Sequence, residues 1–140
     1  MSDGYFAYWP KSVPRSLLLP QTSLYYNVEV SATRYPNKPY LVYYDTPITF
    51  AQFRDETERL AGFLEHDCGV RRGDRVLLYT QNSPQFILAY YAILRANAVV
   101  VPVNPMNRAS ELRHYVVDTG ASTLITTQDL FPETATLFGD

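Results

Sequence analysis

The apolar residues change their spacing at Thr22, and this change predicts an arm followed by a helix. Residues 1–21 mix aromatic side chains with three prolines, which block a regular helix or a central strand. Because the segment is also too aromatic to stay free of the domain, we expect an extended arm laid across it. After the arm, apolar spacings of three and four predict a helix that Thr22 or Ser23 caps and Pro36 ends. Its apolar stripe consists of Leu24, Val28, Ala32 and Tyr35.

The next segment predicts a hairpin and a second helix. The β-rich runs Tyr40–Tyr44 and Ile48–Thr49 flank Asp45–Pro47, whose turn-forming residues predict the bend of the hairpin. The stretch Thr49–Gln52 has the form of a capping box, so we expect a helix to begin there and to end at Gly69. The apolar face of this helix consists of Phe53, Thr57, Leu60, Ala61 and Leu64.

Strand and helix patterns alternate in the remaining half of the chain. In the first strand both the odd-numbered and the even-numbered positions are apolar, as expected for a strand covered on both faces. Ser83 can cap the apolar helix that follows this strand. The elements are strands 75–80, 98–101 and 123–126, helices 84–96 and 108–119, and a partial helix from Asp129. This order predicts an α/β fold with a three-layer, open, mostly parallel sheet and helices on both faces.

Composition narrows the classes of function. The chain has 140 residues, 46% of them hydrophobic, which is enough for the core of one domain and excludes a disordered tail. Its 12 basic and 14 acidic residues give a formal charge of −2, which supplies no electrostatic reason to bind nucleic acid or anionic lipid. Cys68 is the single cysteine, so an intrachain disulfide and a cysteine-based zinc site are excluded.

The apolar segments are too short for a membrane span. The longest uncharged apolar run, Phe86–Leu94, has nine residues, whereas a membrane-crossing helix needs about twenty. The first four residues lack the cationic and apolar regions of a secretory signal. We therefore expect a cytoplasmic protein that does not cross a membrane.

Two loops stand where an α/β sheet binds ligands, beyond the carboxyl ends of its strands. They are Thr80–Ser83 and Pro102–Pro105. We expect Asn82, Ser83 and Asn104 to cap helices and close turns, and ligand binding by them is the alternative. No two of the six glycines are closer than four residues apart, so the sequence contains no glycine-rich loop that could bind phosphate. The two lysines, Lys11 and Lys38, do not follow such a loop either. We assign no cofactor-binding residue.

The other reactive residue types also have simpler explanations. Glu111, His114 and Asp118 share a helix face, which we interpret as a solvated surface because the second copy of a di-iron motif is missing. His66 is expected to complement a helix C-terminus, and Cys68 to be a small packing residue. The 12 tyrosines are expected mostly in the core and in half-buried strands, with a ligand tunnel or an interface as the alternative. We assign no catalytic residue and no metal ligand.

A series of short blocks carries a family resemblance. The blocks are Arg34–Pro39, Ile48-Thr49-Phe50, Leu60-Ala61, Gly69–Val76, Asn82–Phe86, Ala92–Ala96, Val99–Pro105, Glu111-Leu112 and Asp118–Ala121. In this order and spacing, from about Thr22 to Thr127, the chain resembles the N-terminal part of the AMP-forming acyl-CoA synthetases. This adenylate-forming superfamily includes firefly-type luciferases and peptide-synthetase adenylation domains. Trp9-Pro10-Lys11 and residues 13–24 look most like members that act on fatty acids.

The resemblance implies a two-step ligase. A carboxylate attacks the α-phosphate of ATP to give an acyl-adenylate and pyrophosphate, and the thiol of coenzyme A then takes the acyl group. ATP, Mg and coenzyme A are thus implied for the parent enzyme and none for this chain, because the family's phosphate loop, ribose-binding segment and catalytic lysine follow the region matched here. Residues 1–21 would be an arm, and residues 22–140 the first portion of the AMP-binding domain, truncated before the phosphate loop.

We therefore expect an inactive fragment whose partner is the remainder of its own chain, with a fatty acid or another carboxylate as substrate of the full enzyme. An aryl-CoA ligase, a peptide-synthetase adenylation domain and a stand-alone, non-catalytic binding module stay open as alternatives. A homodimer stays open as well, because a truncated domain exposes apolar surface.

Overall fold

The computed structural model describes residues 3–137, so residues 1–2 of the expected arm and residues 138–140 of the expected domain lie outside the described residues. The elements are η1 (Asp3–Tyr8), α1 (Tyr25–Arg34), β1 (Pro39–Tyr43), β2 (Thr46–Thr49), α2 (Phe50–His66), β3 (Arg75–Tyr79), α3 (Pro84–Arg95), β4 (Val99–Pro102), α4 (Ala109–Thr119), β5 (Thr123–Thr126) and α5 (Phe131–Thr134). Every helix and strand expected from the sequence is present. The partial helix expected from Asp129 is the four-residue α5.

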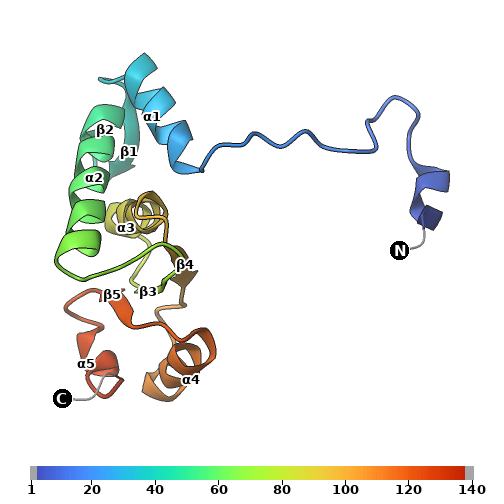
Figure 1. Ribbon diagram of the computed structural model, residues 1–140. Coiled ribbons are helices and arrows are strands. Elements are labelled where there is room, and N and C mark those ends of the chain that lie inside the picture. The colour runs from blue at the N-terminus through green and yellow to red at the C-terminus, as the bar shows by residue number, and fades with distance from the viewer. Residues whose placement is uncertain (1–2, 138–140) are drawn as a thin grey trace.

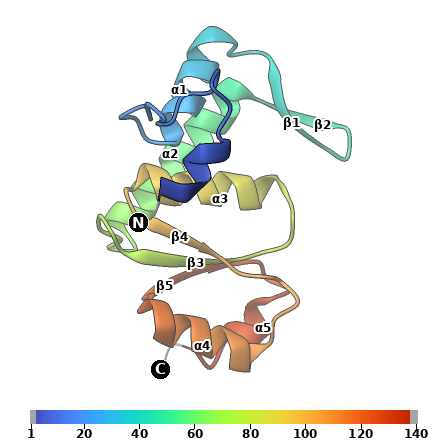
Figure 2. The same cartoon turned by 90° about the vertical axis from the view of Figure 1, so that its right-hand side faces the viewer.

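A three-stranded parallel sheet, in the order β4-β3-β5, forms the centre of the fold (Figure 1). Val76 of β3 is in register with Val100 of β4 on one side and with Thr123 of β5 on the other. In Figure 2, α3 lies on one side of the sheet together with α1 and α2, and α4 and α5 lie on the other. The predicted α/β class with helices on both faces is confirmed.

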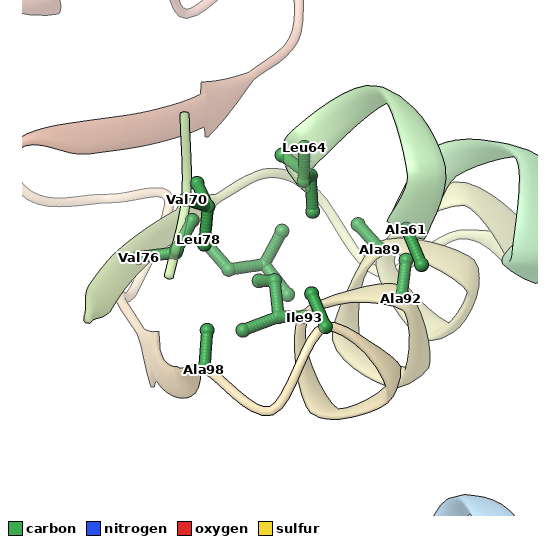
Figure 3. Packing of buried hydrophobic residues seen from close by; sticks show 10 residues of the cluster. Ala61, Leu64, Val70, Val76, Leu78, Ala89, Ala92, Ile93 and Ala98 are labelled. Atoms are coloured by element: carbon green, nitrogen blue, oxygen red, sulfur yellow. The ribbon is translucent and has the colours of Figure 1, made fainter. Parts of the chain in front are cut away.

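The alternating side chains of β3 separate two cores. Val76 and Leu78 point toward α2 and α3, whereas Leu77 and Tyr79 belong to the cluster under α4. Figure 3 shows Leu64 of α2 and Ile93 of α3 meeting over β3. These strand residues are fully buried, as the uninterrupted apolar run predicted for a strand covered on both faces.

Helix α2 begins as the capping box predicted. The Thr49 hydroxyl accepts a hydrogen bond from the Gln52 backbone N–H (3.3 Å), and the Gln52 side-chain oxygen accepts one from the Thr49 N–H (2.9 Å). At the other end Gly69 has a φ of 68°, a left-handed conformation that favours glycine. Phe53, Thr57, Ala61 and Leu64 are buried, so the predicted face is the buried one.

The beginning of α1 differs from the prediction. The Ser23 hydroxyl accepts a hydrogen bond from the Tyr26 N–H (3.3 Å), but the helix starts only at Tyr25. The buried stripe is Tyr25, Val28 and Ala32, whereas Leu24 and Tyr35 are exposed. Tyr25 replaces Leu24 in the core because its ring can be buried while its hydroxyl donates to Glu58 (3.1 Å) on α2.

The hairpin is confirmed, with a tighter turn than expected. Tyr44 and Asp45 have positive φ values of 46° and 60° and connect β1 to β2 as a two-residue loop. Pro47 therefore lies within β2, opposite Val42, and not in the turn. A proline is tolerated there because β2 is an edge strand, where one N–H faces away from the ladder.

The arm does not lie across the domain, so that prediction is wrong. Between η1 and α1 the chain turns at residues 10–13, and the extended segment that follows connects it to the body from which the arm projects (Figure 1). Its contacts are local: the Trp9 indole N–H donates to the Val13 carbonyl (3.0 Å), the Phe6 and Trp9 rings pack edge to face, and the Arg15 guanidinium lies over Phe6. These local contacts involve Phe6 and Trp9, two of the aromatic side chains that we expected to pack on the body, whereas Tyr8 is exposed.

Candidate functional site

The carboxyl ends of β3 and β4 lie side by side and are followed by helices on opposite faces of the sheet. The chain leaves β3 toward α3 and leaves β4 toward α4 (Figure 2). In open α/β sheets such a divergence forms the crevice in which ligands bind. The two loops singled out from the sequence, 80–83 and 102–105, are thus neighbours at this edge of the sheet.

The first loop is used mainly to start α3. The Ser83 hydroxyl accepts a hydrogen bond from the Phe86 N–H (3.4 Å), and Pro84 occupies the first turn. The buried hydroxyl of Thr80 donates to the carbonyl of Gln81 (3.3 Å). Asn82 is exposed, and its side chain has no hydrogen-bond partner among residues 3–137. The capping role expected of Ser83 is confirmed, whereas Asn82 caps nothing there.

The second loop is held by hydrogen bonds that fix its backbone. The Asn104 side-chain oxygen accepts from the Met106 N–H (2.9 Å), so the expected turn-forming role of Asn104 is confirmed. The Asn107 side chain donates to the hydroxyl of Tyr115 on α4 (2.8 Å). The fully buried Tyr79 donates its hydroxyl toward the carbonyls of Asn107 (2.7 Å) and Pro105 (3.3 Å).

Tyr79 is a residue that the sequence reasoning missed. Burial raises the pKa of its phenol, and the nearby Glu133 carboxylate adds to the shift, so the hydroxyl stays a donor. A tyrosine at the end of an otherwise aliphatic, buried strand was the available signal, because a buried phenol requires a hydrogen-bond partner.

An apolar pocket of about 360 Å³ opens beside the first loop. The hairpin strand β1 forms one wall and the beginning of α3 the other. Its lining includes Leu41, Val42, Tyr43, Pro84, Phe86 and Ile87. Asn82 and Ser83 contribute the polar part of the lining, so the pocket suits an apolar group with a small polar end.

The beginning of α4 is tied to α5 by an acidic side chain. Glu133 accepts a hydrogen bond from the Arg108 guanidinium (2.7 Å) and another from the Ala109 N–H (3.1 Å). These two donors lower the pKa of Glu133, because both favour its charged form. Arg113 adds a third tie by donating to the Thr136 carbonyl (2.9 Å).

The residues present do not fit a nucleotide triphosphate or its metal ion. Lys38 lies 5.7 Å from the ring of Tyr35, near the end of α1, and Lys11 is in the arm, so neither approaches the two loops. Within residues 3–137 there is no group of three acidic, histidine or cysteine side chains that could hold a metal ion.

Most of the remaining sequence candidates lie apart from the two loops, but Asp118 lines a hollow together with Asn104 of the second loop. Glu111 accepts from the Arg108 N–H (2.9 Å) in the first turn of α4, and His114 and Asp118 are exposed on the same helix. His66 is in the last turn of α2, as expected. Cys68 is exposed, so its interpretation as a packing residue is wrong: it follows the end of α2, where the chain runs along the surface.

The tyrosines are less buried than predicted. Tyr25 and Tyr79 are in the core, but several described tyrosines are exposed because they lie in the arm, on the outer side of α1 or at the tip of the hairpin. The exposed ones are Tyr8, Tyr26, Tyr35, Tyr43 and Tyr44. Core and half-buried positions thus explain about half of the tyrosines and not most of them.

Comparison with known proteins decides the family. The family model described as AMP-binding enzyme matches residues 28–138. This chain belongs to the AMP-binding enzyme family. The long-chain-fatty-acid–CoA ligase of Bacillus subtilis is 34% identical to it over 92% of the chain, and that of Salmonella typhimurium is 37% identical over 69%. The chain spans 23% and 17% of the length of these relatives.

Solved structures agree on the fold. A long-chain-fatty-acid-CoA ligase from Archaeoglobus fulgidus superposes with a TM-score of 0.75 at 28% identity, over 84% of this chain and 25% of its own. An anthranilate CoA ligase in complex with anthranoyl-AMP gives a TM-score of 0.79 at 26% identity, over 85% and 23% of the two chains. The chain therefore has the fold of part of the N-terminal domain of an adenylate-forming enzyme. None of the helices within residues 3–137 is long and apolar enough to cross a membrane.

Proposed function

We propose that this chain is the N-terminal scaffold of an ATP-dependent, AMP-forming fatty-acid–CoA ligase. The observation that carries the proposal is the identity of 34% to the Bacillus subtilis long-chain-fatty-acid–CoA ligase over nearly the whole chain, within a family defined by AMP binding. Such an enzyme joins a fatty acid to AMP with release of pyrophosphate, and the thiol of coenzyme A then displaces the AMP.

The structure supports a scaffold role for these residues. In the two carboxyl-end loops, the polar groups that form hydrogen bonds within the chain have structural roles: they cap the start of α3 and fix the backbone of loop 103–107. The lysines lie elsewhere. The phosphates of ATP need closely placed backbone N–H groups and cations. In our proposal, polypeptide beyond this chain supplies them and packs against the sheet, and residues 1–140 alone are inactive.

An aromatic acid is the second candidate substrate. The solved anthranilate CoA ligase superposes at least as well as the fatty-acid enzyme, and a 4-coumarate–CoA ligase-like protein of Arabidopsis thaliana is 33% identical over 65% of the chain. Activation of the acid and its transfer to coenzyme A would be the same in both cases. The carboxylic acid that is activated would differ.

A chimera tests the scaffold role. Residues 28–138 replace the matched segment of the Bacillus subtilis ligase, and formation of palmitoyl-CoA from palmitate, ATP and coenzyme A is measured. We expect the chimera to form palmitoyl-CoA. A chimera carrying Ile93→Asp is the control for a broken scaffold, and a conservative Val117→Thr change on the exposed side of α4 is its matched neutral control.

A folded chimera that binds ATP but forms no acyl-adenylate would contradict the scaffold role. The choice of acid needs a separate assay, with palmitate and 4-coumarate offered to a polypeptide that contains this chain and a phosphate loop. Preference for 4-coumarate would contradict the fatty-acid part of the proposal and leave the scaffold role standing.

A further inference from the structure

The arm differs in charge from the rest of the chain. Residues 1–21 carry Lys11 and Arg15 and one acidic residue, Asp3, so their formal charge is +1. The formal charge of the whole chain is −2, so a positive arm is attached to a negative body. The whole-chain charge gave no reason to expect binding to anionic lipid because it averages over these two parts.

The arm also exposes three consecutive leucines. Leu17, Leu18 and Leu19 are 83%, 101% and 71% exposed, and this segment projects from the body (Figure 1). Burial of apolar surface is the main favourable term in association, so an uncovered run of this kind is a candidate contact surface.

Aromatic side chains stand next to the leucines and the two cations. The hydrogen bond from the Trp9 indole to Val13 bends the chain back, so that Trp9, Arg15 and Leu17 line one hollow of about 470 Å³. Tyr8 is exposed at the end of η1. Tryptophan and tyrosine favour the headgroup region of a bilayer, leucine its acyl boundary, and lysine and arginine its anionic phosphates.

The geometry of the leucines distinguishes a bilayer from a protein partner. In an extended segment successive side chains point to opposite sides, so a groove on a protein would accept alternate leucines only. A bilayer surrounds an inserted segment and can bury all three. We propose that residues 4–24 bind the surface of an anionic phospholipid bilayer, with Leu17, Leu18 and Leu19 inserted and Lys11 and Arg15 against the lipid phosphates.

The single tryptophan of the chain reports directly on this binding. Trp9 lies in the arm, so its fluorescence can be followed as vesicles are added to the intact protein. With vesicles of phosphatidylcholine and phosphatidylglycerol we expect a blue shift and co-sedimentation. With phosphatidylcholine alone, the loss of attraction to two cations predicts binding about thirty-fold weaker.

Arm variants test which side chains act. The triple change Leu17→Ser, Leu18→Ser and Leu19→Ser should abolish the blue shift, and Lys11→Gln with Arg15→Gln should remove the difference between the two lipid compositions. These residues are outside the core, so the body should keep its unfolding temperature. Val117→Ser on α4, where the side chain is 77% exposed, is the matched control and should change nothing.

Three results would overturn the proposal. The first is no blue shift with anionic vesicles. The second is a shift that survives the triple serine change. The third is a shift that appears without lipid as protein concentration rises and is lost in the triple variant, because a second copy of the chain would then cover the arm. None of these readouts depends on ATP or on catalysis, so failure here leaves the proposed function untouched.

Discussion

The two faces of the parallel sheet are closed by different kinds of interaction. On the face covered by α2 and α3, aliphatic side chains such as Leu64, Val76 and Ile93 pack with almost no exposure (Figure 3). On the other face, α4 buries a single side chain completely, Leu112, and exposes Val117. The second face relies more on hydrogen bonds that link α4 and its N-cap to α5 and to loop 103–107.

The two kinds of interaction hold different parts of the molecule. Apolar packing fixes the helices relative to β3, whereas polar contacts fix the backbone of loop 103–107, where Tyr79 and Asn107 meet α4. The conformation of the carboxyl-end loops therefore depends on a few hydrogen bonds, whereas the packing of helices on the sheet depends on the apolar surface that it buries. Substitutions on the two faces should therefore differ in the size and in the type of their effects on stability.

The largest effect is expected from Ile93→Ala on the α3 side. Ile93 is fully buried between α3 and β3, and its neighbours are buried as well, so the cavity left behind cannot collapse easily. We expect a loss of about 3 to 5 kcal/mol in the free energy of unfolding. Urea denaturation followed by far-UV circular dichroism measures it.

Leu112→Ala is the matched change on the α4 side. Leu112 is equally buried, but several of its neighbours are only partly buried, so the surrounding side chains can move into the space. We expect a smaller loss of about 2 to 3 kcal/mol in the same denaturation experiment. A loss equal to that of Ile93→Ala would remove the difference between the two faces.

Tyr79→Phe tests the polar ties directly. The change keeps the ring in the core and removes the hydroxyl that donates toward the carbonyls of Asn107 and Pro105. We expect a loss of about 1 to 2 kcal/mol and faster amide hydrogen exchange confined to residues 103–108. Leu77→Val, on the same face of β3, is the control: it should destabilise the fold without this local increase in exchange.

The substitution Glu133→Gln should cause the smallest loss of stability and should change how stability depends on pH. The pKa of Glu133 is lowered by Arg108 and the Ala109 N–H, so its contribution to stability is complete above the ordinary carboxyl pKa. This contribution is lost as the pH falls from that value through the lowered pKa of the folded state.

Melting temperatures measured from neutral to acidic pH check this sign. The original chain should melt above the Glu133→Gln variant at neutral pH, and the two curves should converge in acid. Parallel curves over the whole range would show that the carboxylate charge does not contribute to holding α5 against α4.

The sequence predicted the elements whose signals are local. The capping box at Thr49 and Gln52 and the strand Thr123–Thr126 lie where expected, because the residues that define them are neighbours in the chain. The position of the two carboxyl-end loops could also be predicted, because in a parallel sheet the order of strands and helices determines at which edge these loops lie.

Two of the errors concern contacts between residues far apart in the chain, and a third concerns the arm. The exchange of Tyr25 for Leu24 in the core depends on Glu58, which is on another helix. The role of Tyr79 depends on a loop that follows the next strand. The arm was expected on the body because its composition is aromatic, and composition does not show that Phe6 and Trp9 contact each other.

The central claim is that residues 1–140 are a scaffold without a nucleotide site of their own. Isothermal titration of the folded chain with ATP and magnesium tests it most directly, with the denatured chain as the reference for non-specific heats. We predict no saturable binding, because the two carboxyl-end loops present no cradle of backbone N–H groups and no lysine. Saturable binding of ATP to this chain alone would contradict the account.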